Sequence, residues 1–101
     1  MNAVTFCTNF VNDMLDGRNT FDQNYNLRYA NNLFYSYDMP ICEHVFVNKC
    51  HVFRVIEKDQ SPSVTTTKHI QKLIDVIEEF VNLEHNVSID YVSSLKGAQN
   101  V

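Results

Sequence analysis

The sequence lacks a basic excess, a long apolar run and an even number of cysteines, and each absence excludes a class of protein. Twelve acidic residues outnumber eight basic ones, giving a net charge of −4, which disfavours direct nucleic-acid binding because duplex affinity comes mainly from Lys and Arg. No run is long enough to span a bilayer, and the N-terminus lacks the pattern of a signal peptide. We therefore expect no membrane association. Three cysteines indicate free thiols in a reducing cytoplasm.

The composition that remains is that of a globular protein. Apolar residues make up 45% of the 101 residues and charged residues 20%, which is typical of a chain that buries one core. We find no internal repeat, linker or low-complexity segment. The sequence therefore predicts a single domain over residues 1–101.

Two segments have the apolar spacing of amphipathic helices. The first is Val4–Asp16, with Asn2 or Thr5 as its N-cap and Gly17 as the left-handed residue that ends it. The second is Val64–Val81, in which one threonine of the run 65–67 is predicted to cap the start. Its buried stripe is formed by Ile70, Leu73, Ile74, Ile77, Phe80 and Val81.

Between the helices the pattern favours strands. Phe21–Tyr29 alternates and predicts a strand or an extended loop, and Leu33–Tyr37 predicts an aromatic strand that ends before Pro40. Ile41–Val47 and Cys50–Ile56 are predicted to pair as a hairpin. A two-residue loop would place Val45 opposite Val52, Glu43 opposite Arg54 and Ile41 opposite Ile56, although a slip of one residue stays open.

These elements predict an α+β fold. We expect an N-terminal helix, an antiparallel meander of three to four strands, and a long helix packed on one sheet face. Val87–Val92 is either a last short strand or an extended tail. The sequence does not indicate whether the first helix packs on the same face as the second.

A zinc site is the first chemical hypothesis, because Cys42, His44, Cys50 and His51 carry the right ligand atoms. In the hairpin register, however, Cys50 lies on the sheet face opposite the other three residues. The four side chains would not then close one tetrahedral site. We therefore predict no metal ligands and no cofactor, and the sequence leaves metal binding by this set to be tested.

Other catalytic patterns are weaker. A Cys–His pair would need an oriented base and a donor pocket, which the sequence does not indicate. The carboxylates of the second helix follow the pattern of a solvated face. An aromatic platform for single-stranded nucleic acid, with Arg28 as its one basic residue, lacks the electrostatic half of such a site. The residues of this platform would be Phe21, Tyr25, Tyr29, Phe34, Tyr35 and Tyr37. Because none of these patterns is complete, we predict that the protein is not an enzyme.

The start of the second helix is a candidate anion site, since backbone N–H groups point outward there. Lys68 and His69 oppose the helix dipole at this position, which simple capping does not explain. Capping by one threonine nevertheless satisfies the same donors. The anion-binding candidates are Thr65, Thr66, Thr67, Lys68 and His69.

Two motifs resemble a group of small bacteriophage proteins of uncharacterised function. They are Tyr35-Ser36-Tyr37, followed by Pro40-Ile41 and a hairpin, and the helix start Ser63-Val64-Thr65-Thr66-Thr67-Lys68-His69-Ile70. The resemblance covers Leu33 to Leu73. It implies a phage origin and an accessory role in the host cytoplasm, and it carries no activity for any named residue.

The sequence therefore supports two functional hypotheses. The first is a non-enzymatic phage protein that binds a host protein and inhibits or redirects it, with acidic side chains meeting a basic groove. The second is a small-ligand or nucleic-acid-handling domain with an anion at the Thr65–His69 helix start. A homodimer formed through a strand edge is compatible with both. The partner-binding candidates are Asp75, Glu78, Glu79 and Glu84.

Overall fold

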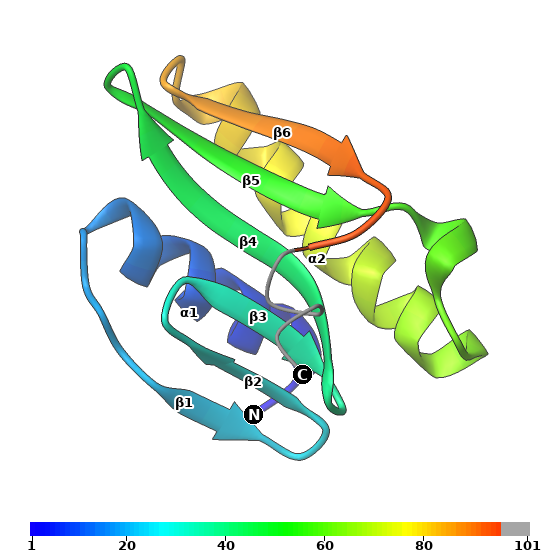
Figure 1. The fold of residues 1–101 in the computed structure, drawn as a ribbon. Coiled ribbons are helices and arrows are strands. Elements are labelled where there is room, and N and C mark those ends of the chain that lie inside the picture. The colour runs from blue at the N-terminus through cyan, green and yellow to red at the C-terminus, as the bar shows by residue number, and fades with distance from the viewer. Residues whose placement is uncertain (96–101) are drawn as a thin grey trace.

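The computed structural model describes residues 1–95, which form two long helices and a six-stranded sheet (Figure 1). Among these residues no helix is both long and apolar enough to cross a membrane. The elements are α1 (Ala3–Leu15), β1 (Asp22–Asn24), β2 (Leu27–Ala30), β3 (Leu33–Ser36), β4 (Met39–Val47), β5 (Cys50–Ile56), the 3-10 turn η1 (Lys58–Gln60), α2 (Val64–Leu83) and β6 (Val87–Val92).

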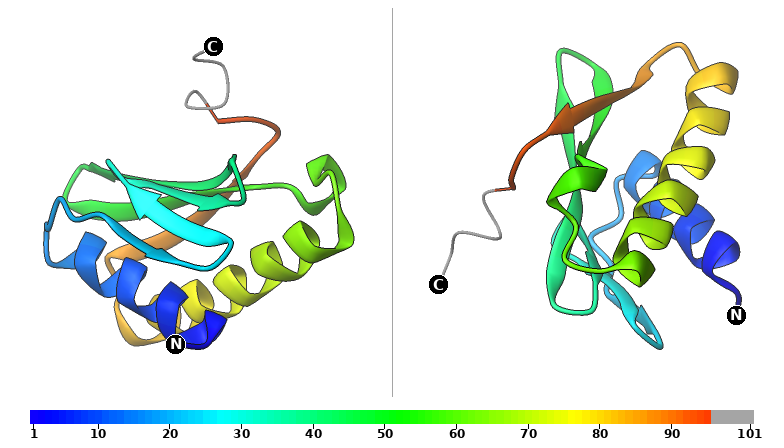
Figure 2. Two further views of the ribbon diagram at one scale, coloured as in Figure 1. Left: turned by 90° about the horizontal axis from the view of Figure 1, so that it is seen from below. Right: turned by 90° about the vertical axis from the view of Figure 1, so that its right-hand side faces the viewer.

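The sheet follows the chain in the order β1-β2-β3-β4-β5-β6. The first five strands are antiparallel to their neighbours, and β6 returns through α2 to pair parallel with β5. Figure 2 shows both helices on the same face of the sheet. The α+β class and the long helix on one face are confirmed, but the sheet has six strands rather than three to four.

The predicted β4–β5 register is confirmed. Val45 lies opposite Val52 and Glu43 opposite Arg54, and an Arg54 guanidinium nitrogen lies 2.9 Å from a Glu43 carboxylate oxygen. Asn48 and Lys49 form the loop, with φ angles of 53° and 64°. This pattern of two left-handed residues matches the twist of a two-residue hairpin.

The prediction of one strand over Phe21–Tyr29 is wrong. A two-residue turn at Tyr25-Asn26 divides this segment into β1 and β2, with Asn24 paired to Leu27. A second turn, at Tyr37-Asp38, joins β3 to β4, which begins at Met39. Periodicity missed the first turn because Tyr25 stands where a turn residue was expected. The break predicted before Pro40 is present as the second turn, although Met39 and Pro40 belong to β4.

The helix ends follow capping chemistry. Asn2 accepts a hydrogen bond from the backbone N–H of Thr5, as predicted, and Gly17 has a φ of +71°, which suits glycine just after a helix. The predicted threonine cap of α2 is wrong. Ser63 has the extended backbone of an N-cap, and its hydroxyl accepts from the N–H of Thr66 at 3.1 Å.

The core lies between the sheet and the two helices and is rich in aromatic rings. Phe10 packs within 5–6 Å, centroid to centroid, of three rings contributed by three strands, Tyr29, Phe34 and Phe53. Tyr29 also donates a 2.8 Å hydrogen bond to the Asp13 carboxylate on α1. The chain after β6 turns across the opposite sheet face (Figures 1 and 2), where Leu95 is fully buried.

Candidate protein-binding site

The two sequence motifs meet in one buried cluster of polar side chains. The Ser36 hydroxyl, from β3, lies 2.7 Å from Nδ1 of His69 and 3.1 Å from Oγ1 of Thr66, both from α2. The Ser63 hydroxyl in turn donates to Thr66. Burial, with a smaller contribution from Lys72, lowers the pKa of His69. The neutral imidazole therefore suits the hydrogen bond to Ser36.

This cluster links two segments that are distant in the chain. Ser36 is 0% exposed and Thr66 is 1% exposed, so a substrate cannot reach either hydroxyl. The ring of His69 also contacts Tyr37, with 6.2 Å between centroids. The cluster therefore anchors the β3–β4 turn to the first turns of α2.

Two tyrosines project from the adjacent turns with unusual backbone geometry. Tyr25 has a φ of 55° and Tyr37 a φ of 56°, a region in which Cβ crowds the following carbonyl. Tyr25 is 86% exposed and Tyr37 46% exposed. Packing in the core therefore does not compensate the cost of these conformations.

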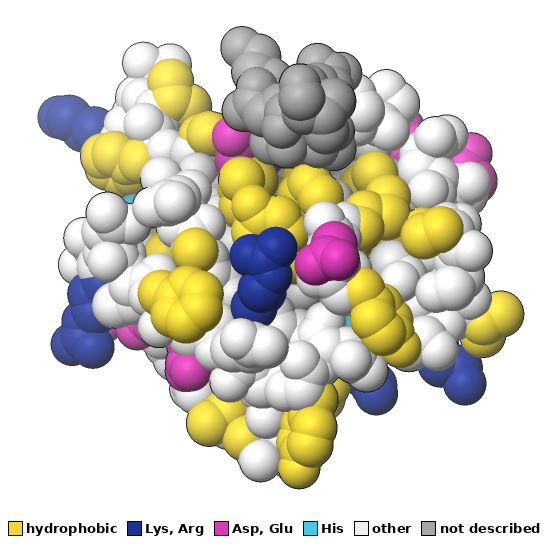
Figure 3. Space-filling view, turned by 60° about the horizontal axis from the view of Figure 1, so that its bottom comes forward, with side chains coloured by type: hydrophobic (Ala, Val, Ile, Leu, Met, Phe, Trp, Pro, Cys, Tyr) yellow, Lys and Arg dark blue, Asp and Glu magenta, His cyan; other side chains and the backbone are white. Residues whose placement is uncertain are grey.

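The tyrosines border a shallow cleft of about 230 Å³, which we call the tyrosine surface. Figure 3 shows the side of the molecule that lies lowest in Figure 1, where hydrophobic side chains surround one basic and one acidic side chain. The cleft lies beside the turns that end β1 and β3. It is lined by Gln23, Tyr25, Asn26, Arg28, Tyr37 and Asp38.

Arg28 is held in place at this cleft. Its guanidinium carbon lies 3.8 Å from the ring centroid of Tyr35, a cation–π arrangement. One of its nitrogens lies 4.0 Å from the carboxylate of Asp38, whose side chain is fully exposed. Tyrosine and arginine are the residues most enriched at the energetic centres of protein interfaces. The tyrosine surface therefore has the composition of a protein-binding site.

The predicted anion-binding residues do not act as one group. Thr66 and His69 belong to the buried cluster, whereas Thr65 and Lys68 are exposed. The hydroxyl of Thr67 donates back to the carbonyl of Ser63. The Ser63 side chain already occupies a position where an anion would accept from the helix.

The predicted acidic residues all lie on the solvent side of α2 or just after it. Asp75, Glu78, Glu79 and Glu84 are exposed. Asp75 accepts a hydrogen bond from the amide of Gln71 at 2.8 Å. The four residues line no cleft with the tyrosine surface, so their contribution to binding would be through charge at a distance.

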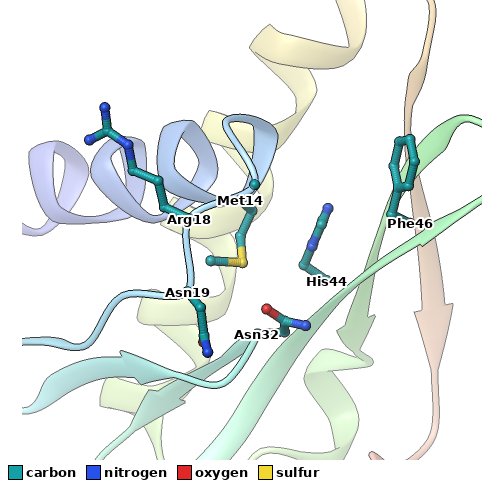
Figure 4. A pocket seen from close by; sticks show the side chains of 7 residues that line it. Met14, Arg18, Asn19, Asn32, His44 and Phe46 are labelled. Atoms are coloured by element: carbon teal, nitrogen blue, oxygen red, sulfur yellow. The ribbon is translucent and has the colours of Figure 1, made fainter.

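The proposed zinc ligands are divided as the register predicted. Nε2 of His44 lies 2.9 Å from Nδ1 of His51, while Cys42 is buried in the core and Cys50 is exposed. Within residues 1–95 no three His, Cys, Asp or Glu side chains come close enough to share a metal ion. His44 and Met14 line a hollow of about 200 Å³. Figure 4 shows these two side chains beside one another, with Arg18 directed away.

The six residues considered as an aromatic platform serve different purposes. Tyr29 and Phe34 are buried in the core, whereas Phe21 is 67% exposed. Tyr35 supports Arg28 from the sheet face opposite the helices. Only the two turn tyrosines project into the cleft, so the rings do not form a continuous stacking surface.

Fold and site together describe a small α+β protein with an exposed aromatic and arginine surface and a partly buried serine–histidine contact. The chain belongs to a family of unknown function, DUF8033, which it matches over residues 9–86. This range contains both motifs and the whole tyrosine surface. Neither the curated proteins nor the solved structures give a match.

Sequence reasoning identified the two motifs but not their contact. A signal was present, because Thr66 falls on the same helical stripe as Ile70, Leu73 and Ile77, and a hydroxyl on a buried stripe needs a partner. The left-handed backbone of Tyr25 and Tyr37 carried no periodic signal. Tyrosine is typical of strands, so its presence did not indicate this backbone conformation at either position.

Proposed function

We propose that this protein is a non-enzymatic binding protein that attaches to another protein through the tyrosine surface. The observation that carries the proposal is the pair of exposed tyrosines in left-handed backbone. Such conformations cost stability and persist at sites where function requires the side chain. Tyr25 gains little from the fold in return for that cost, and Tyr37 gains only partial burial and the contact with His69.

The neighbouring side chains support a protein partner. Arg28 is pre-organised on Tyr35, so less conformational freedom is lost when it meets a partner. Rigid tyrosine rings provide contact area at low entropic cost. Asp38 has a fully exposed side chain beside Arg28, and Asp22 is exposed on the neighbouring strand β1. The partner surface is therefore expected to be mainly basic, with a hydrogen-bond acceptor for Arg28 and apolar positions that receive the two rings.

The acidic residues of α2 would assist by electrostatic steering. With a net charge of −4 and four exposed carboxylates on or near α2, the protein would attract a basic partner before contact. The resemblance to small phage proteins leads us to propose a host protein as that partner, with inhibition or redirection as the outcome. The identity of the partner as a host protein and the inhibition or redirection of that protein both depend on binding through the tyrosine surface.

The proposal is tested by affinity capture from bacterial lysate with three versions of the protein. The wild type and Phe46→Asn should retain one stoichiometric protein, and the double variant Tyr25→Asn/Tyr37→Asn should lose it. Phe46 is the matched control because it is also an exposed aromatic residue, at 61%, and lies on β4 away from the cleft. Asparagine tolerates left-handed backbone, so loss of capture would not reflect unfolding.

Two results would contradict the proposal. One is equal capture of the same protein by the wild type and by the double variant. The other is the loss of capture only when the fold is lost, as measured by circular dichroism on the same samples.

A further inference from the structure

The strand β6 forms an edge of the sheet that no other strand of residues 1–95 covers. Among residues 1–95 it pairs only with β5. The opposite edge is β1, which has three polar residues and is too short to pair extensively. The six residues of β6, VSIDYV, include one charge, Asp90, and no proline or lysine. Edge strands that avoid association are usually short, charged or interrupted. The strand β1 is short, whereas β6 is longer and carries a single charge.

The backbone of β6 shows which groups face outward. The N–H of His51 donates to the carbonyl of Asn86, and the N–H of Glu57 donates to the carbonyl of Val92. In a parallel pair, alternate residues of one strand make all of its bonds to the other. The even-numbered residues of β6 therefore bond to β5. Ile89 and Tyr91 direct their N–H and C=O groups away from the sheet. Val87 directs only its C=O there, because its N–H donates to the carbonyl of Glu84.

We propose that β6 pairs antiparallel with β6 of a second copy, across a two-fold axis at Ile89. Ile89 then forms a hydrogen-bonded pair with Ile89 of the partner subunit, and the N–H of Tyr91 donates to the free carbonyl of Val87 of the partner subunit. Val87 lies opposite Tyr91 of the partner subunit, an aromatic and β-branched pair that stabilises sheets. Two six-stranded sheets join into one.

Charge selects this register over its neighbour. An axis at Asp90 would place two aspartates directly opposite one another, which is destabilising. The axis at Ile89 instead places Ser88 opposite Asp90 of the partner subunit, twice in each dimer. A second copy is therefore a better occupant than an arbitrary strand, because β6 is complementary to itself without a charge conflict. The pairing is independent of the tyrosine surface.

The test is sedimentation equilibrium of the purified protein and of two variants at one position. Ser88→Lys creates two Lys–Asp pairs per dimer and should tighten the dimer about 3- to 10-fold. Ser88→Asp places like charges opposite and should weaken it by a similar factor. Ser88 is exposed, so both variants should fold, which thermal unfolding checks.

A third variant examines the backbone. Ile89→Pro removes an outward N–H but none of the bonds to β5, and it should give a monomer that keeps its circular dichroism spectrum. If that variant unfolds, the opposite shifts of the two Ser88 variants still decide the question. A wild type that is monomeric at its highest soluble concentration would overturn the proposal. So would a dimer that responds equally to lysine and aspartate at position 88.

Discussion

The hydroxyl of Ser36 lies 2.7 Å from Nδ1 of His69, so residues 33 positions apart in the chain share one partly buried hydrogen bond. The bond joins the middle of the Tyr-Ser-Tyr segment to the helix start that carries the threonine run. It also fixes Tyr37, the next residue, against the His69 ring. The two motifs are therefore one structural unit that positions part of the tyrosine surface.

Replacing Ser36 with alanine should destabilise the protein by about 1–3 kcal/mol, because His69 is left without its partner in a partly buried site. Urea unfolding measures this change in the free energy of unfolding. The matched control is Ser88→Ala, on an exposed strand position, which should change stability by less than about 0.5 kcal/mol. Equal effects of the two substitutions would mean that the cluster contributes little.

Replacing Tyr25 with asparagine should stabilise the protein by about 1 kcal/mol, because the left-handed backbone is strained for tyrosine and tolerated by asparagine. Tyr25 is better suited to this test than Tyr37, because its side chain is 86% exposed and makes fewer packing contacts that the substitution would remove. Thermal unfolding should show a higher Tm than that of the wild type. A lower Tm would show that the ring contributes to folding and would remove the main argument for its role in binding.

Only one of the three thiols should react readily in the folded protein. Burial raises the pKa of Cys7 to about 12 and raises that of Cys42 as well, so neither forms the reactive thiolate near neutral pH. Cys50 is exposed. Labelling with a thiol reagent should modify Cys50 first and the other two only after denaturation, as mass spectrometry of the peptides will show.

Stability should fall as the pH drops from about 6.5 toward 4. Burial, assisted by the nearby His51, lowers the pKa of His44 to about 4. Between these pH values the unfolded chain binds a proton that the folded protein excludes, so acid favours unfolding. The loss should reach about 3 kcal/mol at full effect.

The variant His44→Gln isolates this contribution, because glutamine is buried without a titrating group. Urea unfolding at pH 7 and at pH 4.5 should show a smaller difference for this variant than for the wild type. His85→Gln, at an exposed position after α2, should keep the full difference. An unchanged pH dependence in His44→Gln would assign the acid sensitivity to other groups.

The sequence predicted best what depends on local pattern. The long helix was found from its apolar stripe, and the β4–β5 register from the agreement of Glu43 with Arg54 and Val45 with Val52. The turn at Tyr25 was missed because tyrosine is typical of strands and rare in left-handed turns. The strand count was too low because that turn divides one predicted strand into two, and because Val87–Val92 was left as either a strand or a tail.

Contacts between distant segments were beyond local pattern. Val87–Val92 was identified as a possible strand, but its parallel pairing with β5 depends on the path of α2 across the sheet. The contact of Ser36 with His69 depends on the same packing. Each required the position of α2 on the sheet, which the helical periodicity of α2 does not specify.

The central claim, binding through the tyrosine surface, is tested most directly by titrating the captured partner against the wild type and Tyr25→Asn/Tyr37→Asn. The free energy of unfolding is measured on the same samples. We predict at least about 100-fold weaker binding, the loss typical of two interface tyrosines, with stability equal to or above that of the wild type. Unchanged affinity in a folded double variant would contradict the account.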